Sequence, residues 1–206
     1  MRGALSEGNF ATCPAVPGVN YDEYSRMEDV LPLVRQYLTP FAPNPAAQVA
    51  AVEFYNQALD HYFLTANSIE INDLDKGVFT GWERTGLRFL TYVNQAAGMN
   101  PVCRFYRAPA YGDSHFYSAS PAECAATAAR YPDWINESSA VFYIQLPDAR
   151  GACPAGTRPL WRFFNKVTVN HRYTAEVVIR DQMRAKPAVW IPEGYGRDQT
   201  VMCASL

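Results

Sequence analysis

The sequence has little net charge, and it lacks long apolar runs. With 18 Lys and Arg against 20 Asp and Glu, the formal net charge is −2, which gives no electrostatic case for binding nucleic acid. No run of about 18 apolar residues occurs, so no membrane-spanning segment is predicted. The first ten residues contain no apolar h-region. If the protein is exported, its signal peptide has been removed or lies outside this sequence.

The sequence also lacks the short motifs that mark common enzymes and metal sites. It contains no GxSxG, HExxH, P-loop or GxGxxG motif, and none of its five cysteines forms a CxxC pair. These absences favour a protein that is not an enzyme and needs no cofactor. Aromatic residues, by contrast, are abundant, with 13 Tyr, 11 Phe and 4 Trp. Because aromatic side chains suit half-buried strands, we expect more strand than helix.

The most informative feature is a unit of about 50 residues that occurs three times. Each copy has an aromatic pair, a polar loop, Asp, Ser or Asn before a histidine, a further aromatic residue, and then Ser or Thr followed by Ala. This alignment places the three histidines of the chain at one position of the repeat: His61, His115 and His171. A tryptophan follows each histidine by 21, 19 and 19 residues: Trp82, Trp134 and Trp190. We expect these tryptophans to be buried, packing a helix onto the sheet.

The sequence pattern of each copy predicts two short strands, a helix and a third strand. The helix is clearest in the second copy, where Ser120 is a candidate N-cap, Pro121 follows at the first helical position, and Glu123 completes a capping box. The helix of the first copy is expected to start at Asn67 and to end near Gly77, and that of the third to cover residues 176–185.

One such unit cannot bury its aromatic face alone, whereas three packed units can. We therefore predict a β-rich α+β fold with a three-repeat domain at residues 51–206, its copies at about 51–98, 101–150 and 153–206. Three copies favour a pseudo-threefold, trefoil-like closure into one domain, and an open array of three units is the alternative. Residues 1–50 do not match the repeat. They are predicted to be an N-terminal appendage, with one helix over 21–38, interrupted by Pro32, and a Pro/Ala linker.

The repeat motifs resemble those of a known family. They are FYN…DHYFLTA (54–66), PVCRFY…SHFYSA (101–119), ECA (123–125), CPAGT (153–157) and NHRYT (170–174). As a set they are similar to the DUF5648 repeat, whose function is unknown, over about residues 50 to 206. The resemblance implies an exported bacterial accessory module, often found at the C-terminal end of secreted proteins. It implies no established activity and no functional residues.

The cysteines are spread in a way that suits disulfides within single repeats. Cys103 starts a predicted strand and Cys124 lies in the helix that packs on that hairpin, while Cys153 and Cys203 open and close the third copy. We therefore expect the pairs Cys103–Cys124 and Cys153–Cys203, as in a protein of an oxidising compartment. Cys13 is then the odd cysteine, free or bonded to a partner outside the sequence. The alternative is five reduced cysteines.

The histidines allow three interpretations. In the first, each follows a turn residue and has a structural role, binding a backbone carbonyl or packing on aromatic rings. In the second, each contributes to a separate ligand site in its own repeat. In the third, His61, His115 and His171 converge on one Zn²⁺ that activates a water molecule for hydrolysis. We favour the first, in which the protein has no metal site.

The loop tyrosines are candidate ligand contacts, because a sugar can lay its apolar C–H face on an aromatic ring. They are Tyr111, Tyr131 and Tyr195. We expect a non-catalytic binding or assembly module that is extracellular, on the cell surface or periplasmic. Its partner would be a glycan, a cell-envelope component or a protein. One alternative is a structural subunit of a larger extracellular complex, docked through residues 1–50. Another is a metal-dependent hydrolase that uses the three histidines.

Overall fold

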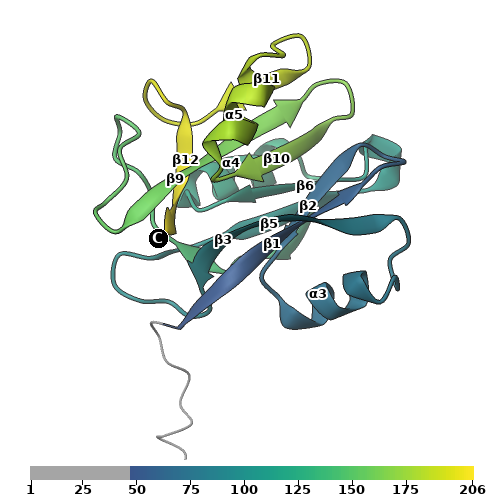
Figure 1. Cartoon of the computed structure of the whole chain (residues 1–206), viewed down its shortest axis with the longest axis horizontal. Helices are drawn as coiled ribbons and strands as arrows, with labels where there is room; N and C mark the ends of the chain where they lie inside the picture. The colour runs from purple at the N-terminus through teal and green to yellow at the C-terminus, as the bar shows by residue number, and fades with distance from the viewer. Residues whose placement is uncertain (1–46) are drawn as a thin grey trace, which may run out of the picture. The chain divides into compact units, whose positions relative to one another are not determined.

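The computed structural model describes residues 47–206, which belong to one compact unit of the chain (Figure 1). The predicted appendage lies outside these residues except for 47–50. Its predicted helix over 21–38 and Cys13 also lie outside them. The first described strand begins at Gln48, a few residues before the predicted start of the repeat domain at 51. Among the described helices, none is long and apolar enough to cross a membrane.

The order hairpin, helix, strand occurs three times along the described chain. The first copy contains β1 (Gln48–Asn56), β2 (His61–Thr65), α3 (Ser68–Asp75) and β3 (Trp82–Tyr92). The second contains β5 (Cys103–Arg107), the short 3₁₀ helix η3 (Pro109–Tyr111), β6 (Ser114–Ser118), α4 (Pro121–Arg130) and β7 (Ile135–Ser138). The third contains β9 (Thr157–Asn165), β10 (Asn170–Thr174), α5 (Val177–Arg184), β11 (Trp190–Glu193) and β12 (Thr200–Ser205). Two short strands, β4 (Asn100–Pro101) and β8 (Tyr143–Ile144), complete the set.

The strands form two antiparallel sheets that divide the repeats unequally. One sheet joins the first and third copies in the order β10-β9-β12-β3-β1-β2, with β11 on β9 and with β8 joining both β3 and β4. The other holds the second copy alone, in the order β6-β5-β7. Figure 1 shows α3 and α5 on different sides of these strands. The predicted β-rich α+β class is confirmed, whereas the trefoil-like closure stays a prediction.

The three predicted helices are confirmed. Residues close to each helix specify where it begins and ends. Asn67 caps α3 by accepting hydrogen bonds from the amides of Ile69 and Glu70, and Ser120 caps α4 by accepting one from Glu123. The helix α5 starts after Glu176 and ends before Ala185. Both expected disulfides are present, Cys103–Cys124 and Cys153–Cys203. The first of them ties α4 to β5.

The register of the hairpins corrects the alignment of the histidines. In the first hairpin His61 pairs with Asn56 and Tyr62 with Tyr55, whereas in the second and third hairpins His115 and His171 take the place of Tyr62, opposite Tyr106 and Phe164. His61 instead shares its position with Ser114 and Asn170. The prediction of one shared histidine position is therefore wrong by one residue, and in a strand one residue reverses the face to which the side chain points.

The turn before each second strand supports this corrected register. A residue with positive φ stands at the same place in all three hairpins: Asp60 (53°), Asp113 (49°) and Val169 (60°). The next residue starts the strand, and it is buried in each case: His61, Ser114 and Asn170. These polar side chains reach across repeats, since Asn170 Nδ2 donates to Ser114 Oγ at 3.3 Å and Asn170 Oδ1 accepts from the amide of Tyr62 at 2.8 Å.

Two buried tyrosines link the hairpins from within the core. The hydroxyl of Tyr117 donates to the carbonyl of Leu64 at 2.6 Å, and the hydroxyl of Tyr173 donates to the carbonyl of Tyr117 at 2.8 Å. All three residues belong to one buried cluster with members from every repeat. Because both hydroxyl groups are satisfied, these rings add buried apolar area without leaving a polar atom unpaired. The three copies therefore share one central core.

Candidate ligand-binding site

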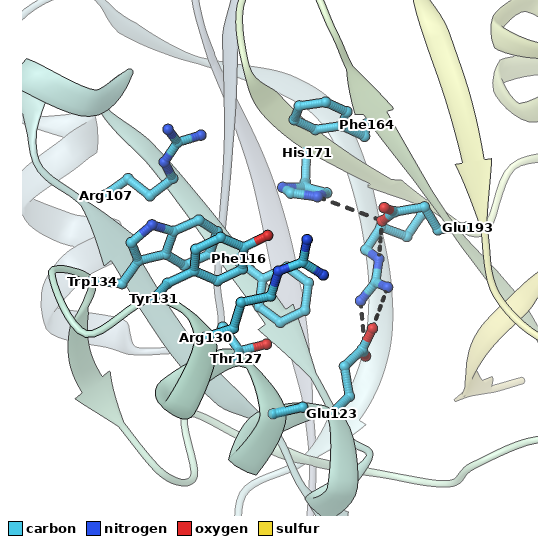
Figure 2. A pocket seen from close by; sticks show the side chains of 12 residues that line it. Arg107, Phe116, Glu123, Thr127, Arg130, Tyr131, Trp134, Phe164, His171 and Glu193 are labelled. Atoms are coloured by element: carbon cyan, nitrogen blue, oxygen red, sulfur yellow. Dashed lines mark hydrogen bonds and ion pairs between the residues drawn. The ribbon is translucent and has the colours of Figure 1, made fainter.

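A groove with a volume of about 560 Å³ lies where the second and third repeats meet (Figure 2). The second repeat contributes the end of β5, the strand β6, the helix α4 and the residues after it, and the third contributes β9, β10 and β11. The lining residues are Arg107, Phe116, Glu123, Ala126, Thr127, Arg130, Tyr131, Trp134, Arg162, Phe164, His171 and Glu193.

A buried arginine organises one side of this groove. Arg162 is only 5% exposed, and its guanidinium donates to Glu193 Oε2 at 2.6 Å and to Glu123 Oε1 at 2.6 Å and Oε2 at 3.1 Å. Glu123 also accepts from the hydroxyl of Ser118 at 2.5 Å. Figure 2 shows Glu123 and Glu193 on the same side of the groove, with their ion pairs and hydrogen bonds as dashed lines. The set is a charge-assisted network in which one guanidinium from β9 binds two carboxylates, one from the second repeat and one from the third.

The protonation states in this network follow from burial and charge. Burial lowers the pKa of His171, so its imidazole is neutral at pH 7. Burial alone would raise the pKa of Glu193, but contact with His171 and the charge of Arg162 outweigh it and lower the pKa to about 2. For Glu123, hydrogen bonds from Arg162 likewise outweigh burial and lower the pKa. Both carboxylates are therefore ionised at neutral pH.

An aromatic pair forms the opposite wall. The rings of Tyr131 and Trp134 are stacked, with centroids 4.4 Å apart and an angle of 13° between their planes. The guanidinium carbon of Arg107 lies 5.2 Å from the centroid of Trp134, and that of Arg130 lies 5.4 Å from the centroid of Tyr131. The wall is thus a row of two rings with a guanidinium group over each.

The local sequence explains why the two rings meet. The helix α4 ends at Arg130, and Tyr131 leaves it with φ −125°, as expected before Pro132. A turn then closes with a hydrogen bond from the amide of Trp134 to the carbonyl of Tyr131 at 3.0 Å. Only two residues separate the rings in sequence, so this turn stacks them directly.

A smaller pocket of about 200 Å³ occupies the corresponding place between the first and second repeats. Its polar core repeats that of the groove: Arg104 donates to Glu70 at 2.7 Å and lies 2.8 Å from Glu137, and His115 Nε2 lies 3.4 Å from Glu137. The remaining lining is apolar, from Phe63, Leu74, Phe79 and Trp82. The Glu-Arg-Glu-His set is therefore part of how neighbouring repeats join.

The interface between the third and first repeats is filled. At this interface the charged groups have exchanged positions. Glu53 takes the strand position that Arg104 and Arg162 hold in the other two repeats, and Arg172 takes the position of Phe116. The Arg172 guanidinium donates to both Glu53 oxygens at 3.0 Å and lies 4.0 Å from the centroid of the Tyr62 ring. Tyr62 in turn packs against a buried cluster that includes Trp190 and Met183.

The three histidines do not share a site. His61 places Nδ1 2.8 Å from the carbonyl of Asp113 and Nε2 2.9 Å from that of Thr168. His115 faces Glu137 in the smaller pocket, and His171 faces Glu193 in the groove, with 3.5 Å between Nε2 and Oε2. Within residues 47–206 no three His, Cys, Asp or Glu side chains are placed to hold a metal ion. The convergent zinc site expected as an alternative is not formed.

Of the three tyrosines expected to contact a ligand, Tyr131 lines the groove. Tyr111 and Tyr195 are exposed, at 52% and 41%, but line none of the pockets described above. The prediction of buried tryptophans holds for Trp190, at 9% exposure, and is wrong for Trp82 and Trp134, which are half-buried in pocket walls.

Sequence reasoning missed the charged residues of the groove. The sequence patterns predict only a capping box for Glu123, and they assign no role to Arg107, Arg130, Arg162 or Glu193. The available signal was an arginine inside an aromatic strand, because a charged residue between buried neighbours normally has an ionic partner. The partners themselves lie 39 and 31 residues away in the sequence.

Comparison with protein families gives one match. Residues 35–145 match the model of the domain of unknown function DUF5648, over the first two repeats and short of the third. The match agrees with the resemblance seen in the repeat motifs, although those motifs continue into the third repeat. No curated protein and no solved structure shows significant similarity to the chain.

Proposed function

We propose that this chain, which belongs to the DUF5648 family, is a non-catalytic extracellular module. In this proposal it binds a glycan in the groove between its second and third repeats. The observation that carries the proposal is the pairing of an aromatic wall, Tyr131 and Trp134, with a fixed polar core around Arg162. Sugars present both apolar C–H groups and hydroxyl groups, so their binding sites need both kinds of surface.

The dimensions of the groove suit this ligand class. Small-molecule sites commonly have volumes of about 300–1,000 Å³ and combine apolar walls with a few fixed polar groups. The groove has about 560 Å³ and meets both conditions. Because Arg162 already holds Glu123 and Glu193 in place, a ligand would find these oxygen atoms ordered before it binds.

The charge state of the core supports binding without catalysis. A pair of carboxylates that hydrolyses a glycosidic bond needs one protonated member as the general acid. Here both carboxylates have lowered pKa values and are joined to one guanidinium. The pair is thus arranged as a structural ion-pair network, and this argues against hydrolysis of a glycosidic bond by these two carboxylates.

Two further expectations remain part of the proposal. The disulfides Cys103–Cys124 and Cys153–Cys203 are typical of proteins outside the reducing cytosol, which supports an extracellular or periplasmic location. The three repeats would close in a trefoil-like manner around His61, Ser114 and Asn170, a closure supported by the contacts of His61 with the other two copies. A structural subunit docked through residues 1–50 remains the alternative function.

A glycan array with matched variants tests the proposal. We expect the purified, oxidised protein to bind a subset of glycans, and Trp134→Ala and Tyr131→Ala each to weaken that binding by roughly tenfold. Tyr111→Ala is the control, because Tyr111 is more exposed than Tyr131 but lies outside the groove. An array without enriched glycans would refute the proposal, as would an equal loss of binding in the Tyr111 variant.

A further inference from the structure

We infer that the groove selects an anionic sugar, one that carries a carboxylate or a sulfate group, and that Arg107 and Arg130 supply the positive charge that selects it. The inference rests on the proposed function and adds a charge to its ligand. It follows from a comparison of the second repeat with the other two, because the copies share one plan and differ at the groove.

The position of Arg107 has a structural role in the other repeats. Asn56 and Asn165 stand at this position at the end of β1 and β9, and the Oδ1 atom of each accepts two amide hydrogen bonds from the following turn, at 2.9–3.2 Å. An arginine has no acceptor and cannot stabilise the turn in this way. The second repeat also has two more residues in this loop, between Arg107 and Ser114.

The environment of Arg107 differs from that of Asn56 and Asn165. Its guanidinium lies over Trp134 at the groove wall, and its Nε atom is buried with no hydrogen-bond partner in the described part of the chain. No carboxylate of residues 47–206 forms an ion pair with Arg107. A position that departs from the structural pattern of its repeat without a structural gain is where a functional constraint is expected.

Arg130 differs from its counterparts in the same way. The residue at the end of α3 is Asp75, which forms an ion pair with Arg84 at 2.6 Å. The residue at the end of α5 is Arg184, which donates to the carbonyl of Asp198 at 2.7 Å. Arg130 lies over Tyr131 and has no such ionic partner among residues 47–206.

The two arginines give the groove an excess of positive charge. With His171 neutral, the lining has three guanidinium groups, those of Arg107, Arg130 and Arg162, against two carboxylates, so one positive charge is in excess. Both carboxylates are bound to Arg162, so neither pairs with Arg107 or Arg130. Their positions over the ring pair restrict the guanidinium groups, which reduces the ordering needed when an anion binds. Planar N–H donors of this kind match a carboxylate or a sulfate.

The smaller pocket provides an internal contrast. It has the same Glu-Arg-Glu-His core, but the single guanidinium of its lining, Arg104, lies between the two carboxylates of Glu70 and Glu137, and the lining residues outside this core are apolar. The core therefore does not by itself predict an anionic ligand. The added feature of the groove is the pair Arg107 and Arg130.

The test compares neutral, carboxylated and sulfated glycans on one array, followed by titration calorimetry with a trigalacturonate, a sulfated galactose trisaccharide and neutral galactotriose. We expect at least one anionic class to bind ten times or more tightly than its neutral counterpart, and added salt to weaken that binding. In the double variant Arg107→Gln/Arg130→Gln the preference for the anion should disappear. Arg184→Gln, at the matching helix end of the third repeat, should leave it unchanged.

The outcomes separate the inference from the proposed function. If neutral glycans bind as well as anionic ones and Trp134→Ala abolishes both, the proposed function stands and the anionic selectivity is refuted. If the preference for an anion survives in the double variant, Arg107 and Arg130 do not cause this preference and the inference fails. If no glycan of any class binds, the proposed function fails and the inference fails with it.

Discussion

The imidazole of His61 reaches the backbone carbonyl of Thr168, 107 residues later in the chain, at 2.9 Å. Its other nitrogen lies 2.8 Å from the carbonyl of Asp113 in the second repeat. One buried side chain of the first repeat thus contacts a turn in each of the other two. A neutral imidazole donates from one nitrogen and an imidazolium from both, so the ring supplies at least one of these hydrogen bonds in either form.

Replacing this ring should destabilise the whole domain. We expect His61→Ala to lower the free energy of unfolding by roughly 2–4 kcal/mol, because at least one buried carbonyl loses its hydrogen-bond donor and the contacts of the ring with both turns are lost. Urea titration of the oxidised protein measures the change. His115→Ala is the comparison, since His115 lies at a pocket wall and should cost about 1 kcal/mol. An equal loss in the two variants would show that His61 does not have this linking role.

Arg162 should be the most sensitive charged residue of the groove. Arg162→Met leaves Glu123 and Glu193 without their shared cation, and we expect a loss of roughly 2–4 kcal/mol in urea titration. Adding Glu123→Gln and Glu193→Gln should restore much of that loss, because no uncompensated charge then remains. Arg84→Met serves as the control, since its ion pair with Asp75 is exposed and should contribute under about 1 kcal/mol. A failure of the glutamines to rescue would contradict the electrostatic explanation.

Stability should decrease on acidification because of Glu193 and His171. The pKa of Glu193 is lowered to about 2 in the folded protein, so its contribution is present above pH 4.5 and is lost as the pH falls from 4.5 towards 2. The pKa of His171 is also lowered, so the unfolded chain takes up that proton first, and stability decreases below pH 6.5 as well.

The test is thermal unfolding between pH 7 and pH 2. Glu193→Gln should be less stable than the wild type at pH 7 and should approach it at pH 2, giving a flatter profile. Glu83→Gln is the matched surface control, because Glu83 is exposed and lies outside the groove. Parallel profiles for the wild type and Glu193→Gln would refute the assignment.

The two disulfides should differ in their contribution. They close segments of 21 and 50 residues, which on the chain-entropy model stabilise by about 3 and about 4 kcal/mol. We therefore expect Cys153→Ser/Cys203→Ser to lower the unfolding midpoint more than Cys103→Ser/Cys124→Ser. The ligand assay gives a second readout: loss of Cys103–Cys124, which ties α4 to β5, should weaken glycan binding more. The reverse order in both measurements would contradict this assignment.

Val169 offers a stabilising substitution. It has φ 60°, at a turn position that Asp60 and Asp113 occupy in the other copies. A β-branched residue is strained there, whereas asparagine accepts this backbone region. Val169→Asn should therefore increase stability by about 1 kcal/mol, measured as a higher midpoint in urea. Val167→Asn, at an exposed site without positive φ, should show no gain. No gain at Val169 would mean that its packing against Gly112 outweighs the strain.

The parts of the fold that could be predicted are those specified over short distances in the sequence. Ser120, Pro121 and Glu123 define the start of α4 within four residues, and Asn67 does so for α3. Both disulfides join cysteines of one repeat. Such local signals require no knowledge of how the repeats pack.

The prediction of one shared histidine position is wrong because it follows residue identity, whereas the ends of the strands define the register of the repeat. The correct signal was present: Ser or Thr followed by Ala closes each second strand, at Thr65, Ser118 and Thr174. Counting back four residues gives His61, Ser114 and Asn170. The groove could not be predicted in this way, since the contact of Arg162 with Glu123 depends on the packing of one repeat against the next.

Because Arg172 and Glu53 fill the interface between the third and first repeats, the three copies of the unit do not form three equivalent grooves within residues 47–206. A module that binds glycan through the one wide groove of this part of the chain, as proposed, would be monovalent towards a long polymer, however many identical sugars that polymer displays. Its hold on a glycan would follow the affinity of a single site, without the gain in avidity that linked sites provide. Firm attachment to a surface would then depend on many copies of the chain acting together.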